Sequence, residues 1–309
     1  MSLPSRIPDD LLDDLNVRVE RDAPLAPLTW YRVGGPARML VHPANHDELS
    51  AVARRCHEGH IPMYVLGLGA NLLVADGGVD GVVLQLDEPA FCQWRYEENR
   101  LVAGAGCDLM KLVLETAHAG RSGLETLAGI PATVGGATRM NAGGAFGAIG
   151  PAVARVRVMD DQGEVYERQR EDLVFGYRYT NITARFILEV EFDLAEDDPD
   201  ELTRTVKEIF LYKKNSQPMG DRSPGCAFKN PVDDEATPGR ADSAGSLIDR
   251  AGLKGYREGG ASVSQRHANF IVADEGATCA NVLAVLEHVE ETVLEQFGVR
   301  LQREVIVWP

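Results

Sequence analysis

The stretch GLETLAGIPATVGGATRMNAGGAFG, residues 123–147, decides the fold prediction. It is rich in glycine and shows almost no helical or strand periodicity. A compact domain rarely keeps so long an irregular segment without a use for it. Its backbone N–H groups need acceptors, and a bound diphosphate with an extended cofactor would supply them. The alternative is a glycine-rich bend buried between strands, without a ligand.

A second glycine-rich stretch, VLGLGANLLVADGG at residues 65–78, follows an expected strand. Glycines in such a place let backbone N–H groups approach a phosphate closely. No Gly-Lys-Ser/Thr follows, which excludes a P-loop. Gly67 and Gly69 match the dinucleotide fingerprint, but Leu72 takes the place of its third glycine, and strand-forming residues follow instead of a helix. Taken alone, this stretch favours a turn without a ligand.

Around these stretches the chain alternates between expected strands and helices. Helices are expected at residues 46–59, 108–120, 201–214, 243–252 and 279–297, with Asp108 and Thr278 as N-caps. Strands are expected at residues 37–43, 62–69, 81–86, 185–194, 267–273 and 299–308, and hairpins at 93–106 and 154–168. The apolar residues of 185–194 alternate as in a half-buried strand.

An acidic, proline-containing run at residues 195–200 predicts a domain boundary. We therefore expect a peripheral lead-in at residues 1–24, a first domain at residues 25–198 and a second domain at residues 199–309.

Composition restricts the class of protein. The 309 residues carry a formal net charge of -16, which argues against a general nucleic-acid binder. A local basic pocket can still bind an anionic ligand. The longest apolar runs are only as long as a strand, so no membrane span is expected, and MSLPSRIPDD does not read as a secretory signal.

The cysteines point to a reducing compartment. There are five of them, widely spread and without a CxxC pair, so we expect no disulfide framework and a cytoplasmic location. The run Cys56-His57-Glu58-Gly59-His60 holds possible metal ligands. Because no second ligand cluster could complete a tetrahedral shell, a solvated helix end is the preferred interpretation and no metal is expected.

The order of several motifs resembles the UDP-N-acetylenolpyruvoylglucosamine reductase (MurB) family. The motifs are TWYRVGGPA (29–37), VLGLGANLLVADGGVDGVV (65–83), GLETLAGIPATVGGATRMNAGG (123–144), FGYR (175–178), GCAFKNP (225–231), SAGSLIDRAGLKG (243–255) and a final Glu-Val after residue 300. They cover nearly the whole chain in the family order. Because no long insertion follows residue 178, the chain is similar to the shorter, type II-like branch.

The resemblance implies an α+β fold. Residues 25–198 would form a vanillyl-alcohol-oxidase/PCMH-type FAD-binding domain of two subdomains, and residues 199–309 a C-terminal α/β substrate-binding domain. FAD would be the cofactor and NADPH the co-substrate. Both glycine-rich stretches would wrap the FAD. The implied cofactor-binding residues are Gly67, Leu68, Gly69, Ala70, Asn71, Leu72, Gly129, Ile130, Pro131, Thr133, Val134, Gly135, Gly136, Asn141, Ala142 and Gly143.

The implied activity is NADPH-dependent reduction of UDP-N-acetylglucosamine enolpyruvate to UDP-N-acetylmuramate, a step in peptidoglycan precursor synthesis. Arg178, in FGYR, would face the substrate carboxylate with a two-pronged donor set; an ordinary ion pair with Glu171 or Asp172 is the alternative. Glu304, in QREVIVW, would lie near the same carboxylate and act in its protonated form, since burial and a nearby anion raise the pKa of a carboxyl group. Without the resemblance, Glu304 reads as a solvated strand residue.

Cys226, in RSPGCAFKNP (222–231), is a departure from the family, which usually has serine as the proton donor here. A thiol with an ordinary pKa of ~8.5 is a stronger acid than an alcohol and can deliver a proton. Arg178 or Lys229 could lower that pKa, and a thiolate has no proton to give. Ser223 is the rival donor.

The substrate diphosphate needs cations. Lys213, Lys214, Arg222 and Lys229 form the basic concentration beside the expected site, although a solvated helix end explains Lys213 and Lys214 equally well. Asn230 follows the family's Lys-Asn-Pro, and Tyr177 could line the pocket. We expect a monomer with no nucleic-acid or membrane partner.

Two other functions fit parts of the pattern. One is an FAD-dependent oxidoreductase of the same fold that acts on another substrate. The other is a non-catalytic flavin redox sensor in which Cys226 is the switch. Reoxidation of the NADPH-reduced protein by the enolpyruvyl UDP-sugar would exclude both.

Overall fold

The computed structural model describes residues 7–97, 100–231 and 242–309. Contacts group the chain into two compact units, and each is described by itself. Unit 1 comprises Met1–Ala23, Ala37–Leu68 and Asp80–Leu211; unit 2 comprises Pro24–Pro36, Gly69–Val79 and Tyr212–Pro309. The grouping differs from the predicted division at residues 198/199, because two early segments join the C-terminal part of the chain. Among the described residues, no helix combines the length and apolar character needed to cross a membrane.

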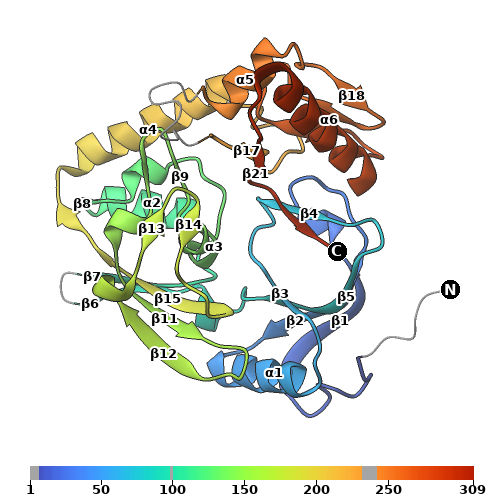
Figure 1. Ribbon diagram of the computed structural model, residues 1–309. Helices are drawn as coiled ribbons and strands as arrows, with labels where there is room; N and C mark the ends of the chain where they lie inside the picture. Colours follow the sequence, from blue (N-terminus) through green and yellow to red (C-terminus); the bar gives the residue numbers. More distant parts are fainter. Residues whose placement is uncertain (1–6, 98–99, 232–241) are drawn as a thin grey trace. The chain divides into compact units, whose positions relative to one another are not determined.

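The first sheet of unit 1 has the strand order β1-β2-β5-β3. Its strands are β1 (Val17–Pro24), β2 (Pro36–Pro43), β3 (Met63–Leu66) and β5 (Val79–Gln85), and α1 (His46–Glu58) packs against it (Figure 1). Asn45 caps α1 by accepting hydrogen bonds from the N–H groups of Asp47 and Glu48. The predictions for residues 37–43, 46–59, 62–69 and 81–86 are confirmed. Of the expected lead-in, residues 1–6 lie outside the described residues, while Ile7 and Leu12 join the core.

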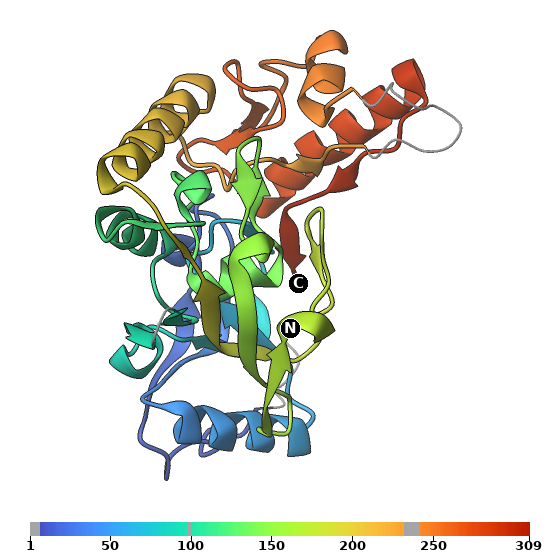
Figure 2. The ribbon, with the colours of Figure 1, turned by 90° about the vertical axis from the view of Figure 1, so that its left-hand side faces the viewer.

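The second sheet of unit 1 is antiparallel and has the order β12-β11-β15-β7-β6. Its strands are β6 (Trp94–Glu97), β7 (Arg100–Gly104), β11 (Val153–Met159), β12 (Val165–Gln169) and β15 (Phe186–Asp193) (Figures 1 and 2). Both predicted hairpins are confirmed by the β6–β7 and β11–β12 pairs; residues 98 and 99 of the first lie outside the described part. Helix α2 (Leu109–His118) is capped by Asp108, which accepts the N–H of Lys111, as predicted.

Strand β15 is more deeply buried than its alternating pattern predicted, because it is the central strand of the five. Its apolar side chains enter the core, and on the other face the side chains of Glu189 and Glu191 are only 19% and 7% exposed. Burial acts to raise the pKa of Glu191, but hydrogen bonds from Arg100 and Arg155 outweigh it and lower that pKa. The acidic positions are therefore paired with arginines and are not solvated.

The glycine-rich stretch 123–147 is less irregular than predicted. It contains helix α3 (Val134–Arg139), in which Thr133 Oγ1 accepts the N–H of Gly136 at the N-terminus. Strands β9 (Gly143–Gly144) and β10 (Gly147–Ala148) pair with each other. The prediction of almost no helix or strand is thus wrong in part. The glycines of α3 give no helical signal in the sequence, and local capping and packing stabilise the helix instead.

Short elements complete unit 1. They are the 3-10 helices η2 (Pro89–Phe91), η3 (Glu125–Leu127), η4 (Gly150–Ala152) and η5 (Arg170–Asp172), and the strand pairs β8 (Arg121–Ser122) with β16 (Ala195–Glu196) and β13 (Phe175–Gly176) with β14 (Tyr179–Thr180). Helix α4 (Pro199–Ser216) covers the predicted helix 201–214 and begins inside the run predicted as a boundary.

Unit 2 is built around α6 (Cys279–Phe297), which covers the sheet β18-β19-β20 (Figures 1 and 2). Its elements are η1 (Ala26–Leu28), β4 (Leu72–Val74), β17 (Phe228–Lys229), α5 (Ala244–Arg250), β18 (Arg257–Glu258), β19 (Ala261–Val263), β20 (Ile271–Ala273), α6, β21 (Gln302–Arg303) and β22 (Ile306–Trp308). Thr278 caps α6 through a capping box with Asn281, which confirms the prediction.

The predicted closing strand 299–308 is wrong as one continuous element. It is two short strands that end and begin on either side of Glu304 and Val305. β21 pairs with β17, whereas β22 pairs in parallel with β4. The change of partner from β17 to β4 interrupts the strand at Glu304, the residue to which the family resemblance assigns a catalytic role.

Candidate active site

The two glycine-rich stretches meet inside unit 1. A Cβ atom built on Gly67 would lie 3.0 Å from Thr133 Oγ1, the atom that caps α3. On the other side of α3, a Cβ on Gly135 would lie 2.8 Å from the Cβ of Ala105, whose carbonyl accepts the N–H of Gly135 at 2.8 Å. The absence of a side chain therefore lets Gly67 approach the capping threonine, and lets Gly135 approach Ala105. Glycine main chain at Gly67, beside the first turn of α3, fits the diphosphate of FAD.

The second stretch also holds the hairpin that carries Arg178. Asn141 Nδ2 donates to the carbonyl of Gly176 at 2.7 Å, and Asn141 Oδ1 accepts the N–H of Gly150 at 3.0 Å. Arg178 donates from Nη2 to the carbonyl of Gly143 at 2.7 Å. The structure thus brings Arg178 together with the predicted cofactor-binding residues Asn141 and Gly143.

Arg178 and Tyr177 form the two-residue turn between β13 and β14, where Gly176 pairs with Tyr179. Arg178 has a φ of 52°, a left-handed conformation that is uncommon for residues with side chains. Its guanidinium carbon lies 5.2 Å from the centre of the half-exposed Tyr177 ring. Strain of this kind is concentrated at functional sites, which agrees with a role for this turn.

Cys226 and Glu304 lie close to one another in unit 2. The N–H of Glu304 donates to the carbonyl of Ala227, the residue after Cys226, at 2.8 Å. Cys226 itself pairs with Phe270 in an isolated antiparallel bridge, just before the start of β20. Gly225, with a φ of 100°, turns the chain immediately before the thiol. Two of the three predicted catalytic residues are therefore neighbours, although they are far apart in the sequence.

A buried amide that sequence reasoning missed supports Cys226. Asn269 is 3% exposed, its Oδ1 accepts the N–H of Phe228 at 2.9 Å, and its Nδ2 donates to the carbonyl of Phe228 at 2.8 Å. Its own carbonyl accepts the N–H of Ala227. The motif HANFIVA was assigned only to a strand, and no pattern in it distinguishes a buried amide from an exposed one.

The first glycine-rich stretch reaches Glu304 as well. Asn71 Nδ2 donates to the carbonyl of Glu304 at 3.0 Å, and the carbonyl of Asn71 accepts the N–H of Ile306 at 3.0 Å. Further along this stretch, the carboxylate of Asp76 accepts the N–H groups of Cys279 and Ala280 at the start of α6. Within unit 2, residues 69–79 are thereby bonded to the C-terminal segment through Asn71 and to the start of α6 through Asp76.

The predicted substrate-binding cations differ in their surroundings. Lys213 is only 7% exposed, so a solvated helix end does not describe it, whereas Lys214 is exposed. Lys229 lies in β17 opposite Gln302. Asn230 Oδ1 accepts the N–H of Ala244 at the start of α5, which gives this amide a structural bond.

Ser223, the rival proton donor, is 4% exposed, and its hydroxyl oxygen has no hydrogen-bond partner among the described residues. All five cysteines are free thiols. Burial raises the pKa of Cys56 and of Cys107 to about 12. The described ranges contain no group of three or more His, Cys, Asp or Glu side chains that could hold a metal.

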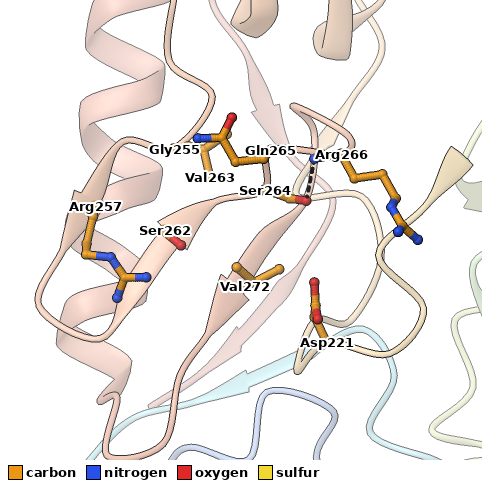
Figure 3. Close-up of a pocket in the computed structure, with 9 residues that line it drawn as sticks. All are labelled: Asp221, Gly255, Arg257, Ser262, Val263, Ser264, Gln265, Arg266 and Val272. Carbon is orange, nitrogen blue, oxygen red and sulfur yellow. Dashed lines mark hydrogen bonds between the residues drawn. The ribbon is translucent and has the colours of Figure 1, made fainter.

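A cavity of about 340 Å³ lies on unit 2 (Figure 3). It is lined by Asp221, Gly255, Arg257, Ser262, Val263, Ser264, Gln265, Arg266 and Val272, none of which sequence had selected. Arg266 Nη1 donates to the carbonyls of Lys214 and Gln217 at 3.3 and 3.2 Å and so fixes the C-terminal end of α4. The cavity therefore adjoins the segment that bears the two predicted lysines.

Two family models match the chain. Residues 37–168 match an FAD binding domain, and residues 217–308 match the UDP-N-acetylenolpyruvoylglucosamine reductase C-terminal domain. Together with the meeting of the two glycine-rich stretches, these matches define an FAD-dependent oxidoreductase, and the predicted α+β fold with an FAD-binding domain and a separate C-terminal domain is confirmed.

Individual relatives narrow the class to one family. The chain is 42% identical to the UDP-N-acetylenolpyruvoylglucosamine reductase of Heliobacterium modesticaldum over 92% of this chain and 88% of that protein. It is 36% identical to that of a Bradyrhizobium species, over 99% and 97% of the two chains. The crystal structure of the Thermus caldophilus enzyme (MurB) superposes with a TM-score of 0.79 and 39% identity, covering 95% of this chain and all of that one. The chain belongs to the UDP-N-acetylenolpyruvoylglucosamine reductase family.

Proposed function

We propose that this protein uses NADPH to reduce UDP-N-acetylglucosamine enolpyruvate to UDP-N-acetylmuramate, with FAD as its cofactor and Cys226 as the proton donor. Family membership supports the reaction class. The observation that carries the assignment of residues is the bond between the N–H of Glu304 and the carbonyl of Ala227, which holds Glu304 beside Cys226. In the proposal the reaction takes place in the cytoplasm on a monomeric protein.

The chemistry requires a hydride, a proton and control of negative charge. When bound, FAD supplies the hydride that NADPH provides. The terminal methylene carbon of the enolpyruvyl group gains the hydride, and negative charge develops on the neighbouring carbon and spreads into the carboxylate. The second C–H bond forms when that neighbouring carbon takes a proton. The net consumption is one NADPH and one proton.

Arg178 has the role of holding the substrate carboxylate. A guanidinium offers two parallel N–H donors to a carboxylate and stays charged throughout, so it stabilises the charge that develops there. Its place in a tight, strained turn, with Gly143 as an acceptor for Nη2, limits the directions that the side chain can take. This limitation supports a positioning function for the turn.

Cys226 has the role of the acid. A thiol S–H delivers a proton to carbon and becomes a thiolate, which solvent then reprotonates. Glu304 acts beside it in the protonated form, because a second negative charge would oppose the charge that forms on the substrate. Gly225 and the bridge to Phe270 fix the main chain of Cys226, which supports its assignment over the fully buried Ser223.

The substrate's UDP end needs cations and hydrogen-bond donors. The proposal assigns this role to Lys213, Lys214, Lys229, Asn230 and Tyr177. Of these residues, Lys213 is the one whose side chain is buried, at 7% exposure.

An anaerobic titration in two steps tests the proposed function. NADPH is added first, and bleaching of the flavin absorbance near 450 nm is followed as about one equivalent is consumed. UDP-N-acetylglucosamine enolpyruvate is added next, and the absorbance should return as UDP-N-acetylmuramate forms. Bleaching without recovery on the UDP-sugar would overturn the proposal and favour the redox sensor. Failure of NADPH to bleach the flavin would favour an oxidoreductase for another substrate.

A further inference from the structure

We propose that Asn71 is a positioning residue for Glu304. Its side-chain amide holds the main chain of Glu304 and thereby fixes where the carboxyl group points during the reaction. The inference rests on the proposed function, because Asn71 gains this role only if Glu304 acts on the substrate. Family resemblance had placed Asn71 among the cofactor-binding residues and gave it no link to Glu304.

Glu304 needs such support because it lies between strands. It follows the last residue of β21 and precedes β22, so no regular ladder fixes it. Its N–H donates to Ala227 at 2.8 Å, and its carbonyl accepts Asn71 Nδ2 at 3.0 Å. One bond holds the peptide group on each side of the Glu304 Cα atom. The direction of the Cα–Cβ bond is therefore set by Ala227 and Asn71 together.

Asn71 is itself well placed to act as a fixed support. Its carbonyl accepts the N–H of Ile306 at 3.0 Å, and the next residue, Leu72, stands opposite Ile306 in the parallel β4–β22 pair. The side chain of Asn71 thus extends from the start of the β4–β22 ladder to Glu304, two residues before β22 begins. The bond requires a side-chain donor, because the carbonyl of Glu304 is an acceptor; the amide of asparagine supplies this donor, and an ionised carboxylate does not.

The bond is more than the strand pairing needs. β4 and β22 already pair at Ile306, Val307 and Trp308, so the strand order does not depend on the side chain of Asn71. The side-chain amide of Asn71 instead donates to Glu304, the residue of this segment to which the proposal assigns a chemical role. At the far end of the same stretch, Asp76 binds the start of α6. Residues 71–76 accordingly brace Glu304 against the body of unit 2.

A double-mutant cycle tests the inference. Asn71→Ala and the isosteric Asn71→Asp are made in the wild-type protein and in Glu304→Gln. The FAD content, the rate of flavin reduction by NADPH and the single-turnover rate of reoxidation by the enolpyruvyl UDP-sugar are measured in each. In the wild-type background the reoxidation rate should fall by about 10- to 100-fold, the usual consequence of misplacing a catalytic group. In Glu304→Gln the same changes should have little further effect, since residues that act through one another are not additive.

Two further readouts separate positioning from cofactor binding and from general damage. The reoxidation rate is expressed per bound, fully reduced FAD, so that a change in FAD affinity does not enter it, and amide hydrogen exchange in a peptide covering residues 300–308 should become faster in the Asn71 variants. The matched control is Ser50→Ala, which removes a side-chain donor to the carbonyl of Gly163 at 3.0 Å in unit 1. It should leave the reoxidation rate unchanged.

An equal loss in both backgrounds would overturn the inference, as would a loss of FAD that accounts for the slower turnover. These outcomes differ from failure of the proposed function, in which the wild-type protein itself would not be reoxidised by the UDP-sugar. In that case the role of Asn71 would fall with the role of Glu304.

Discussion

At the scale of single residues, Cys226 is the proposed proton donor, at a position where the family resemblance implies a serine. The thiol is only partly buried, and its main chain is fixed by Phe270. Cys56 and Cys107 are buried thiols whose pKa is raised by that burial, which makes them poor acids and poor nucleophiles near neutral pH. Cys56 and Cys107 are therefore poor candidates for the working thiol, a role that the proposal assigns to Cys226.

The choice of a thiol should change the pH dependence of the reaction. A donor must be protonated, so activity is lost as the pH rises through the pKa of the donor, ordinarily ~8.5 for a thiol. A serine hydroxyl does not ionise in this range. Cys226→Ser should therefore keep activity and move the alkaline limb of kcat/KM to higher pH. Superimposable profiles of the two proteins between about pH 6 and about pH 10 would count against Cys226 as the group that titrates.

Two supporting residues, Asn269 and Arg266, could not have been found from sequence, and neither could the bond from Asn71 to Glu304. Asn71 and Asn269 act by bonding main-chain groups of residues that are distant in the sequence, and such bonds leave no periodic or compositional signal. Arg266 supports α4 in the same way. The residues that sequence did select, such as Arg178 and Glu304, belong to motifs whose order resembled a family.

At the scale of elements, the pattern of side chains predicted most helices and strands but not where a strand changes partner. Residues 299–308 alternate well enough for one strand, yet β21 and β22 join different sheets. The interruption depends on β17 and β4, which lie far away in the sequence. Burial of β15 on both faces was likewise hidden, because Glu189 and Glu191 resemble solvated positions until their arginine partners are known.

The arginine-paired face of β15 should contribute to stability in a pH-dependent way. The pKa of Glu191 is lowered in the folded state, so its contribution is present above the unfolded value of about 4.3 and is lost as the pH falls through the lower folded value. Glu191→Gln should lower the free energy of unfolding at neutral pH by about 1–3 kcal/mol and remove part of its acid dependence. Urea unfolding at a series of pH values measures both.

The control for that experiment is Glu97→Gln. Glu97 accepts from Arg95 Nε at 2.7 Å, but its side chain is 48% exposed, and exposed pairs contribute about 0–1 kcal/mol. A loss in Glu97→Gln as large as that in Glu191→Gln would contradict the idea that burial decides the difference.

The N-terminus of α6 offers a second test at this scale. Asp76 accepts the N–H groups of Cys279 and Ala280 at 2.7 and 3.1 Å, in addition to the cap that Thr278 provides. Asp76→Ala should lower the free energy of unfolding by about 1 kcal/mol, the usual contribution of a helix cap. Asp76→Asn keeps an acceptor oxygen and should lose less. An unchanged midpoint in urea for Asp76→Ala would contradict the bracing of residues 69–79 by α6.

At the scale of the whole molecule, the order of motifs was enough to predict the family and fold class. What it could not predict is that Pro24–Pro36 and Gly69–Val79 join the C-terminal part of the chain in unit 2. A boundary predicted from composition divides the chain at one point. Contacts such as the β4–β22 pair join segments that lie on opposite sides of that point in the sequence. A single division at residues 198/199 therefore does not include Pro24–Pro36 and Gly69–Val79 in the C-terminal unit.

The central claim is that the reduced flavoprotein is reoxidised by an enolpyruvyl UDP-sugar with the proton of Cys226. The most direct measurement compares wild type and Cys226→Ala in anaerobic single turnovers, after each has been fully reduced by NADPH. Both proteins should be reduced alike. Wild type should then be reoxidised by UDP-N-acetylglucosamine enolpyruvate with formation of UDP-N-acetylmuramate, while Cys226→Ala stays reduced. Reoxidation of Cys226→Ala at the wild-type rate would contradict the account and transfer the role of proton donor to another group, with Ser223 as the first candidate.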